Sequence, residues 1–197
     1  MTGRHGMWDG DMDAIVNVPV SGGENVMLPV IRAIVRMEGD PTRIIVQRRD
    51  NASEVVRGLF EIPGGRWRAG ESPVDAISRE VLEETGLTVV RVHGVVEDAI
   101  DDRRTIASIR PLVIVAGVLG AFPAVHVVVL VDAIGAPRST PGESSDVRWW
   151  SVEEIRSGLG GPSELFIPSS RAALTSYLEW YDRWHDKEGE GEPRHAD

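Results

Sequence analysis

The feature that constrains this chain most is the segment Gly65–Leu87, which combines a glycine turn with a short helix. Pro63 and two glycines interrupt regular structure at its start. Ser72 followed by Pro73 predicts where the helix begins, because a serine side chain caps a helix and proline at the first helical position loses no hydrogen bond. Gly86 predicts where the helix ends. The remaining elements must therefore pack around a turn and helix of defined length.

The predicted helix carries three glutamates, Glu80, Glu83 and Glu84, within an arc of roughly 100°, because a helix turns by about 100° per residue. Like charges at these spacings cost roughly 0.2–0.5 kcal/mol per pair, and we expect no Lys or Arg on the same stripe. A bound cation would supply the missing charge, and carboxylates without histidine or cysteine favour Mg²⁺ or Mn²⁺ over zinc. The alternative is a solvated acidic helix in an unrelated α/β protein, on which Mg²⁺ would have no effect.

Two further pairs of residues are expected to shape this segment. Gly64 and Gly65 let the backbone turn sharply and approach the helix, so that a main-chain carbonyl can join the ligands of the cation. Arg79 is expected on another side of the helix, where it reaches back to Glu71 and holds the preceding loop against the helix. That second pairing would be structural.

Runs of β-branched residues predict the strands of a sheet on both sides of this unit. Leu28–Met37 and Arg43–Arg48 are separated by the turn sequence Glu38–Pro41 and predict a hairpin. The segment Glu97–Arg110 is predicted to be a polar loop. The other predicted strands are Leu59–Ile62, Leu87–Val96, Leu112–Gly117, Val125–Val131 and Asp146–Trp150. Two predicted helices follow them, Ser151–Ser157 and Ser169–His185.

The length of 197 residues suits one domain, which we expect to span residues 27–185 between a partly mobile extension, 1–26, and a disordered charged tail, 186–197. The absence of cysteine excludes disulfides, thiolate zinc sites and a cysteine nucleophile. Glycines and a proline interrupt the long apolar stretch Pro111–Ile134, which predicts two buried strands and no membrane span. The N-terminus lacks the pattern of a signal peptide, so we expect a cytoplasmic protein.

The formal net charge of −10 argues against a nucleic-acid-binding surface, which normally needs a basic footprint. A phosphate-bearing small molecule is still compatible with this charge, provided that divalent cations lie between the carboxylates and the phosphate oxygens. The charge therefore agrees with the acidic helix and favours a small-molecule partner.

The segment Gly65–Leu87 resembles the Nudix box, the signature of the Nudix hydrolase family, at every fixed position of that motif. The likeness extends to the flanking segments and covers about Leu28 to Ile155. It implies the α/β fold of that family, which is an α/β/α sandwich with a central mixed β-sheet. The box residues for which it implies a structural role are Gly65, Glu71, Arg79 and Gly86.

The resemblance also implies a metal-dependent hydrolase of phosphoanhydride bonds, with Mg²⁺ or Mn²⁺ as cofactor and a nucleotide as substrate. The metal ligands would be Glu80, Glu83, Glu84 and the carbonyl of Gly64, and Glu80 or Glu84 would also orient the attacking water. Glu143 resembles in position a loop glutamate that some members use as general base. Its rivals in this chain are Asp98, Asp101 and Asp102.

Arginines and tryptophans near the box are weaker candidates, because such residues are common on surfaces and in cores without any role in binding. The arginines that would clamp phosphates are Arg48, Arg57, Arg66 and Arg104. The tryptophans that would stack on a base are Trp67, Trp149 and Trp150.

The substrate suggested by the resemblance is a nucleotide sugar such as ADP-ribose. Glu61, in Phe60–Pro63, resembles that branch of the family, but Arg103 and Arg104 stand where the branch tends to carry a proline. The alternatives are a nucleoside triphosphate, including an oxidised one, and a module that senses a nucleotide without cutting it. The intact glutamate triad speaks against the sensing module. The family likeness also suggests a homodimer.

Overall fold

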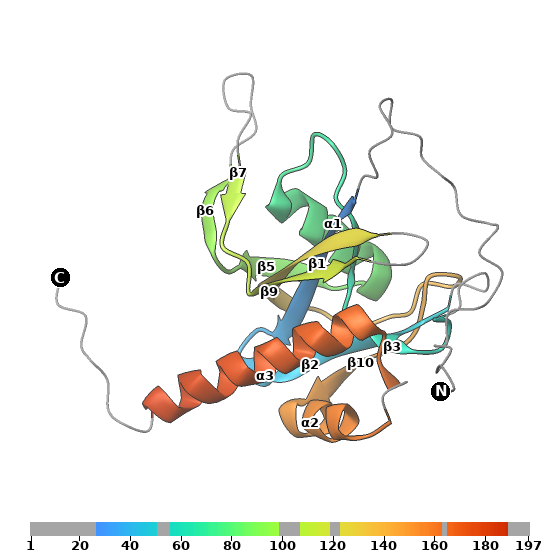
Figure 1. Ribbon diagram of the computed structural model, residues 1–197, viewed down its shortest axis with the longest axis vertical. Helices are drawn as coiled ribbons and strands as arrows, with labels where there is room; N and C mark the ends of the chain where they lie inside the picture. The colour runs from blue at the N-terminus through green and yellow to red at the C-terminus, as the bar shows by residue number, and fades with distance from the viewer. Residues whose placement is uncertain (1–26, 51–55, 99–106, 119–122, 163–164, 189–197) are drawn as a thin grey trace, which may run out of the picture.

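The computed structural model describes residues 27–50, 56–98, 107–118, 123–162 and 165–188 (Figure 1). In chain order its elements are β1 Leu28–Met37, β2 Asp40–Arg49, β3 Phe60–Glu61, β4 Gly64–Arg66, α1 Pro73–Thr85, β5 Thr88–Val92, β6 Val95–Asp98, β7 Ala107–Ile109, β8 Val113–Gly117, β9 Ala124–Ile134, β10 Ser144–Ser151, α2 Val152–Gly160 and α3 Pro168–Glu188.

A mixed sheet forms the centre of the fold, with the strand order β10-β2-β1-β9-β5. β1 and β9 run parallel, whereas the other pairs in this order are antiparallel. β3, β4 and β8 extend the sheet by pairing with β2, β1 and β9, and β6 and β7 form a separate hairpin. Figure 1 shows α1 on one side of the sheet and α2 and α3 on the other. The expected α/β/α sandwich with a central mixed sheet is therefore confirmed.

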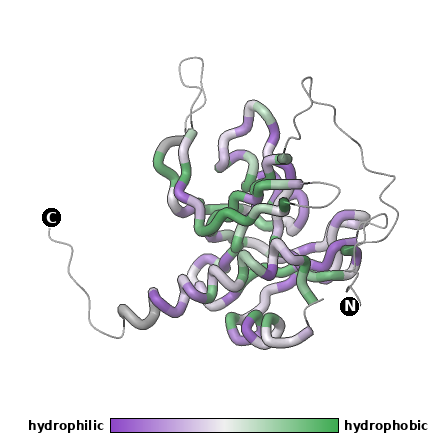
Figure 2. Tube along the Cα trace, in the orientation of Figure 1, coloured by the Kyte–Doolittle hydropathy of each residue, from purple (hydrophilic) through white to green (hydrophobic). Residues whose placement is uncertain are grey.

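Alternate residues of the central strands enter the two cores, because successive side chains of a strand point to opposite faces. On β2, Ile44 and Val46 pack with α2 and α3, whereas Ile45 packs with α1. All three side chains are fully buried. Figure 2 shows the hydrophobic stretches of the crossing strands at the centre of the molecule and a mixed pattern along α3. Burial on both faces explains why these strands read as continuous apolar runs.

α1 has the bounds that the local signals predict. The Ser72 side chain accepts a hydrogen bond from Asp75 N at 3.1 Å, and Pro73 is the first helical residue. Gly86 has φ 71° and ends the helix in a left-handed conformation that favours glycine. Ile77 and Val81 are fully buried against the sheet. The helix is thus fixed at both ends and along one face, which sets the position of its glutamates.

Three predicted segments differ in the structure. The two glycines after Pro63, expected to interrupt regular structure, belong to β4, which pairs with β1. The predicted strand Leu87–Val96 is divided, because β5 ends at Val92 and Gly94, with φ 79°, turns the chain into β6. The predicted polar loop Glu97–Arg110 contains β7, which pairs with β6. Such short strands are stabilised by their partner and not by an apolar run of their own, so periodicity does not predict them.

The long apolar stretch forms strands. β8 and β9 occupy most of it and pair antiparallel from Val113 with Val128 to Gly117 with Ala124. Across the ranges that the structure describes, none of the helices has the length and apolar character needed to cross a membrane.

Candidate functional site

The segment that we call the glycine turn, Gly64 and Gly65 at the start of β4, lies directly against α1. Gly64 is buried with φ 138°, and a β-carbon there would lie 2.3 Å from the carbonyl oxygen of Ile31. A β-carbon on Gly65 would lie 2.5 Å from Glu80 Oε2. Only glycine therefore allows the turn to approach both β1 and the carboxylate of Glu80. The close approach predicted for Gly64 and Gly65 is present.

Glu84, near the end of α1, has a largely enclosed side chain that is bonded to the same turn. Its Oε2 atom accepts hydrogen bonds from Gly64 N at 2.9 Å and from Gln47 Nε2 at 2.7 Å. Burial, and next to it the negative charge of Glu61, raises the pKa of Glu84 to about 7. Glu80 and Glu84 thus both place their carboxylates at the Gly64–Gly65 turn, and one of them is costly to ionise.

Glu61 belongs to a buried ionic cluster beside Glu84. Arg32 Nη1 donates to Glu61 Oε2 at 3.0 Å and to the Ile62 carbonyl at 2.8 Å. Arg49 Nη1 contacts both Glu61 oxygens, at 3.0 and 3.1 Å. From the sequence, Glu61 is expected only as a mark of a family branch, and Arg32 and Gln47 are not expected at the site at all. The available signal was a polar residue inside an otherwise apolar strand, since a buried polar side chain needs a partner.

Arg79 makes the predicted bond to Glu71 and further contacts that were not expected. Its Nε atom lies 2.6 Å from Glu71 Oε1, and its Nη2 atom lies 3.0 Å from Glu71 Oε2. Its Nη1 atom also donates to Glu80 Oε1 at 2.6 Å and to Glu83 Oε2 at 3.2 Å. The expectation that no arginine relieves the acidic stripe was wrong, because Arg79 lies four residues before Glu83, a spacing at which helical side chains are neighbours, and its long side chain also reaches Glu80. Hydrogen bonds to Glu71 and Glu80 raise the pKa of Arg79 further.

The three glutamates of the acidic stripe, Glu80, Glu83 and Glu84, each have protein partners in this arrangement. Within the described ranges, no three acidic or histidine side chains lie close enough to hold one metal ion. Arg79 engages Glu80 and Glu83, whereas Gly64 and Gln47 engage Glu84. The donor set nevertheless fits a hard divalent cation, because it consists of oxygen atoms and because the absence of a side chain at Gly65 lets the Glu80 carboxylate lie against the glycine turn.

Glu143 lies in a turn that is attached to the end of α1. Thr140 Oγ1 donates to the Glu83 carbonyl at 2.7 Å, and Ser144 Oγ donates to the Glu84 carbonyl at 2.7 Å. The Glu143 side chain is exposed. The fold therefore places this predicted general base on a segment in contact with the helix of the box. Of its rivals, Asp98 ends β6 without a described side chain, and Asp101 and Asp102 lie outside the described residues.

The arginine candidates differ in their surroundings. Arg48 donates to the Gly58 carbonyl at 2.7 Å and lies 4.2 Å from the centre of the Phe60 ring. Arg57 pairs with Asp50 at the surface at 3.1 Å. The side chain of Arg66 is exposed, and Arg104 lies outside the described residues. Arg48 is thus held by the protein itself, which leaves Arg66 as the more accessible cation beside the turn.

The three candidate tryptophans, Trp67, Trp149 and Trp150, all make contacts within the protein. Trp150 is buried, with its ring centre 4.9 Å from that of Phe60 and 5.8 Å from that of Phe166. Trp149 packs partly buried on the opposite face of the sheet, near α1. Trp67 donates its Nε1 proton to the Glu71 carbonyl at 3.0 Å. Trp150 is therefore a core residue and not a surface on which a base could stack.

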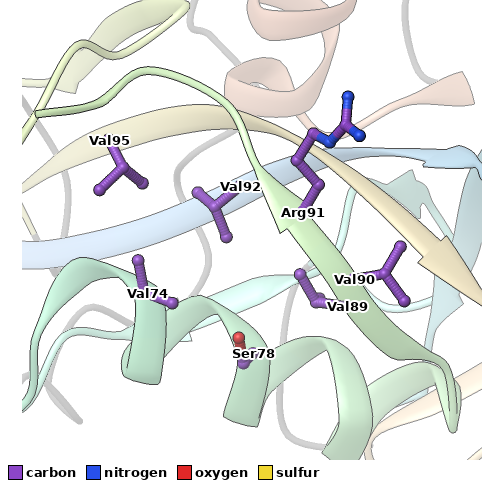
Figure 3. Close-up of a pocket in the computed structure, with 7 residues that line it drawn as sticks. All are labelled: Val74, Ser78, Val89, Val90, Arg91, Val92 and Val95. Atoms are coloured by element: carbon purple, nitrogen blue, oxygen red, sulfur yellow. The ribbon is translucent and has the colours of Figure 1, made fainter.

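A shallow hollow lies on another side of α1, between that helix, β5 and β6 (Figure 3). Arg91 is the one charged residue of its lining, which otherwise consists of Val74, Ser78, Val89, Val90, Val92 and Val95. None of the box glutamates lines it. We therefore place the candidate site at the Gly64–Gly65 turn and not in this hollow.

Comparison with known proteins identifies the family of this chain. The model of the NUDIX domain matches residues 27–169. The uncharacterized Nudix hydrolase orf19 of Rhodococcus erythropolis is 27% identical over 145 residues, which cover 71% of each chain.

Solved structures show the same fold. The MutT NUDIX hydrolase from Burkholderia pseudomallei aligns with a TM-score of 0.56 and 22% identity, over 77% of this chain and 98% of its own. A UDP-X diphosphatase aligns with a TM-score of 0.51 and 17% identity, over 83% of this chain and 67% of its own. The domain match covers more than half of the sequence, so this chain belongs to the Nudix hydrolase family, whose members act on acid anhydrides.

Proposed function

We propose that this Nudix hydrolase cleaves the phosphoanhydride bond of a nucleoside diphosphate joined to another group, with ADP-ribose or another nucleotide sugar as substrate. We propose Mg²⁺ as its cofactor, with Mn²⁺ as a substitute. The observation that carries the proposal is the position of the Glu80 and Glu84 carboxylates at one glycine turn. Carboxylates gathered in this way are suited to a hard cation and to the phosphates that the cation binds.

The residues that would hold the metal are Glu80, Glu83, Glu84 and the carbonyl of Gly64. When bound, a divalent ion neutralises phosphate oxygens and eases attack by water. Arg79 uses Nε and Nη2 for Glu71 and only Nη1 for Glu80 and Glu83. The two metal-binding carboxylates can therefore exchange that partner while the Glu71 loop stays attached to the helix.

Glu143 is our candidate for the group that accepts the proton of the attacking water. Its turn is hydrogen-bonded to the carbonyls of Glu83 and Glu84, so it lies at the end of α1 that carries the ligands. An exposed carboxylate on a short turn can reach a substrate bound at that end and return the proton to solvent. Arg66, exposed beside the turn, is the candidate contact for a substrate phosphate.

The substrate class rests on Glu61 in Phe60–Pro63. Its carboxylate is bonded to Arg32 and Arg49, so Glu61 would not contact the sugar directly. It would act on the site through its negative charge beside Glu84. The related structures are less than 25% identical to this chain and show the fold alone. Nucleoside triphosphates, including oxidised ones, are therefore tested as the alternative substrate class.

The test is release of phosphate or nucleoside monophosphate from a panel of nucleotide sugars, dinucleotides and nucleoside triphosphates with Mg²⁺. Wild type is compared with Glu83→Gln and with Glu179→Gln, which changes an exposed glutamate on α3. We expect cleavage of nucleotide sugars that Glu83→Gln abolishes and Glu179→Gln preserves. Cleavage of triphosphates alone would replace the substrate class. Metal binding without any cleavage would favour the nucleotide-sensing module.

A further inference from the structure

The four carbonyl groups at the end of α1 all have partners, although the last four carbonyls of a helix have none within the helix itself. The Leu82 carbonyl accepts from Gly86 N at 3.0 Å, in the helix cap. The other three accept from a single segment, residues 138–144. These bonds run from Thr140 Oγ1 to Glu83 at 2.7 Å, from Ser144 Oγ to Glu84 at 2.7 Å, and from Arg138 N to Thr85 at 2.8 Å.

Hydrogen bonds within the 138–144 segment also fix the backbone on both sides of Glu143. Glu143 N and Ser144 N donate to the Thr140 carbonyl at 3.0 and 2.9 Å, and Thr140 N donates to Ser144 Oγ at 3.2 Å. The Glu143 carbonyl accepts from Asp50 N at 3.2 Å, and Ser144 is buried as the first residue of β10. The backbone of Glu143 is therefore fixed to the helix end and to the sheet, while its side chain is exposed.

We propose that Thr140 and Ser144 are positioning residues that hold Glu143 in a constant place relative to the box glutamates. This inference rests on the proposed function, in which Glu143 accepts the proton. The two hydroxyls bond to the carbonyls of Glu83 and Glu84, whose own side chains are the candidate metal ligands. Movement of the last turn of α1 is thereby transmitted to Glu143, so the ligands and the base keep their spacing.

The central variant is Thr140→Val, which removes the hydroxyl donor and keeps the shape of the side chain. Thr140→Ser keeps the donor. Thr175→Val is the matched control, because Thr175 Oγ1 donates to the Arg171 carbonyl at 3.0 Å on an exposed face of α3. We expect Thr140→Val to lower kcat roughly 10- to 100-fold without a change in KM, since small displacements of a reacting group have effects of this size. Thr140→Ser should restore kcat, and Thr175→Val should leave it unchanged.

Action through Glu143 is tested in a Glu143→Gln background. If Thr140 acts by positioning Glu143, Thr140→Val causes no further loss of kcat once that carboxylate is absent. An equal further loss in both backgrounds would overturn the inference. A loss of Mn²⁺ affinity in Thr140→Val that accounts for the fall in kcat would overturn it as well, because the hydroxyl would then position the metal ligands alone.

Amide hydrogen exchange of the metal-free protein tests the attachment without any substrate. We expect faster exchange over residues 138–144 in Thr140→Val and Ser144→Ala, and exchange like wild type there in Thr175→Val. If wild type cleaves nothing in the panel, the proposed function fails. Hydrogen exchange then still tests whether the two hydroxyls attach residues 138–144 to the end of α1. Unchanged exchange in both variants would then overturn the positioning role, since the two hydroxyls would hold nothing in place.

Discussion

Gly65 faces the carboxylate of Glu80 so closely that a β-carbon would lie 2.5 Å from Oε2. The backbone of Gly65 is not in the left-handed region, so alanine is allowed there by conformation. Gly65→Ala should therefore displace the flexible end of Glu80 and change stability by less than about 1 kcal/mol. We expect Mn²⁺ affinity to fall roughly 10- to 100-fold, as when a residue that orients a ligand is lost.

Calorimetric titration with Mn²⁺ measures this effect. Gly160→Ala is the control, because a β-carbon at Gly160 has nothing within 4 Å. Unchanged affinity in Gly65→Ala would show that Glu80 is not a metal ligand in this chain.

The bidentate pair of Arg79 and Glu71 should contribute to stability in the absence of metal. Both side chains are largely buried, with exposed fractions of 18% and 20%. A double-mutant cycle with Arg79→Gln and Glu71→Gln should give a coupling free energy of about 1 kcal/mol at pH 7. Arg79 lowers the pKa of Glu71, so the coupling should disappear as pH falls below that lowered value.

Urea unfolding with a chelator present measures the cycle. The comparison pair is Arg57 and Asp50, at 3.1 Å but with exposed fractions of 54% and 35%, for which we expect a smaller coupling. Equal coupling in the two pairs would mean that the burial and bidentate geometry of Arg79 and Glu71 add nothing to stability, and no coupling would mean that Arg79 does not hold the Glu71 loop.

Much of the fold follows from local signals. Ser72, Pro73 and Gly86 predict the bounds of α1, since a cap and a left-handed glycine act within a few residues. The β1 and β2 hairpin follows from two β-branched runs and a turn. The β6 and β7 hairpin does not, because three or four residues carry too little periodicity and depend on pairing.

Part of the candidate site was also predictable from the sequence. The bond between Glu71 and Arg79 was predicted, although Glu71 lies in the loop before α1. The bond of Arg79 to Glu83 joins residues four apart on the helix, so sequence spacing could have indicated it. The bond to the adjacent Glu80 depends on the path of one long side chain, which sequence spacing does not define. Gln47 reaches Glu84 across 37 residues of sequence, and only the packing of α1 against the sheet brings them together.

The tryptophans of β10 give a prediction that separates packing from binding. Trp150 lies between Phe60 and Phe166 in the core, so Trp150→Ala should lower the free energy of unfolding by about 3–5 kcal/mol. KM for the nucleotide substrate should not change at a temperature where the variant stays folded. Trp184→Ala is the control, since that side chain is 55% exposed and should cost less. A rise in KM for Trp150→Ala alone would place the substrate against this strand.

Glu84 should make the metal-free protein less stable as pH rises. Its pKa is about 7 in the folded protein and 4.5 as an ordinary glutamate, so the folded state binds more protons between these values and stability falls with rising pH. Glu84→Gln cannot ionise and should gain stability over wild type across this window, by at most about 3 kcal/mol. Mg²⁺ should stabilise wild type and not the variant. Urea unfolding from pH 5 to 8 measures the difference, and a difference independent of pH would show that burial does not hold this carboxylate in its protonated form.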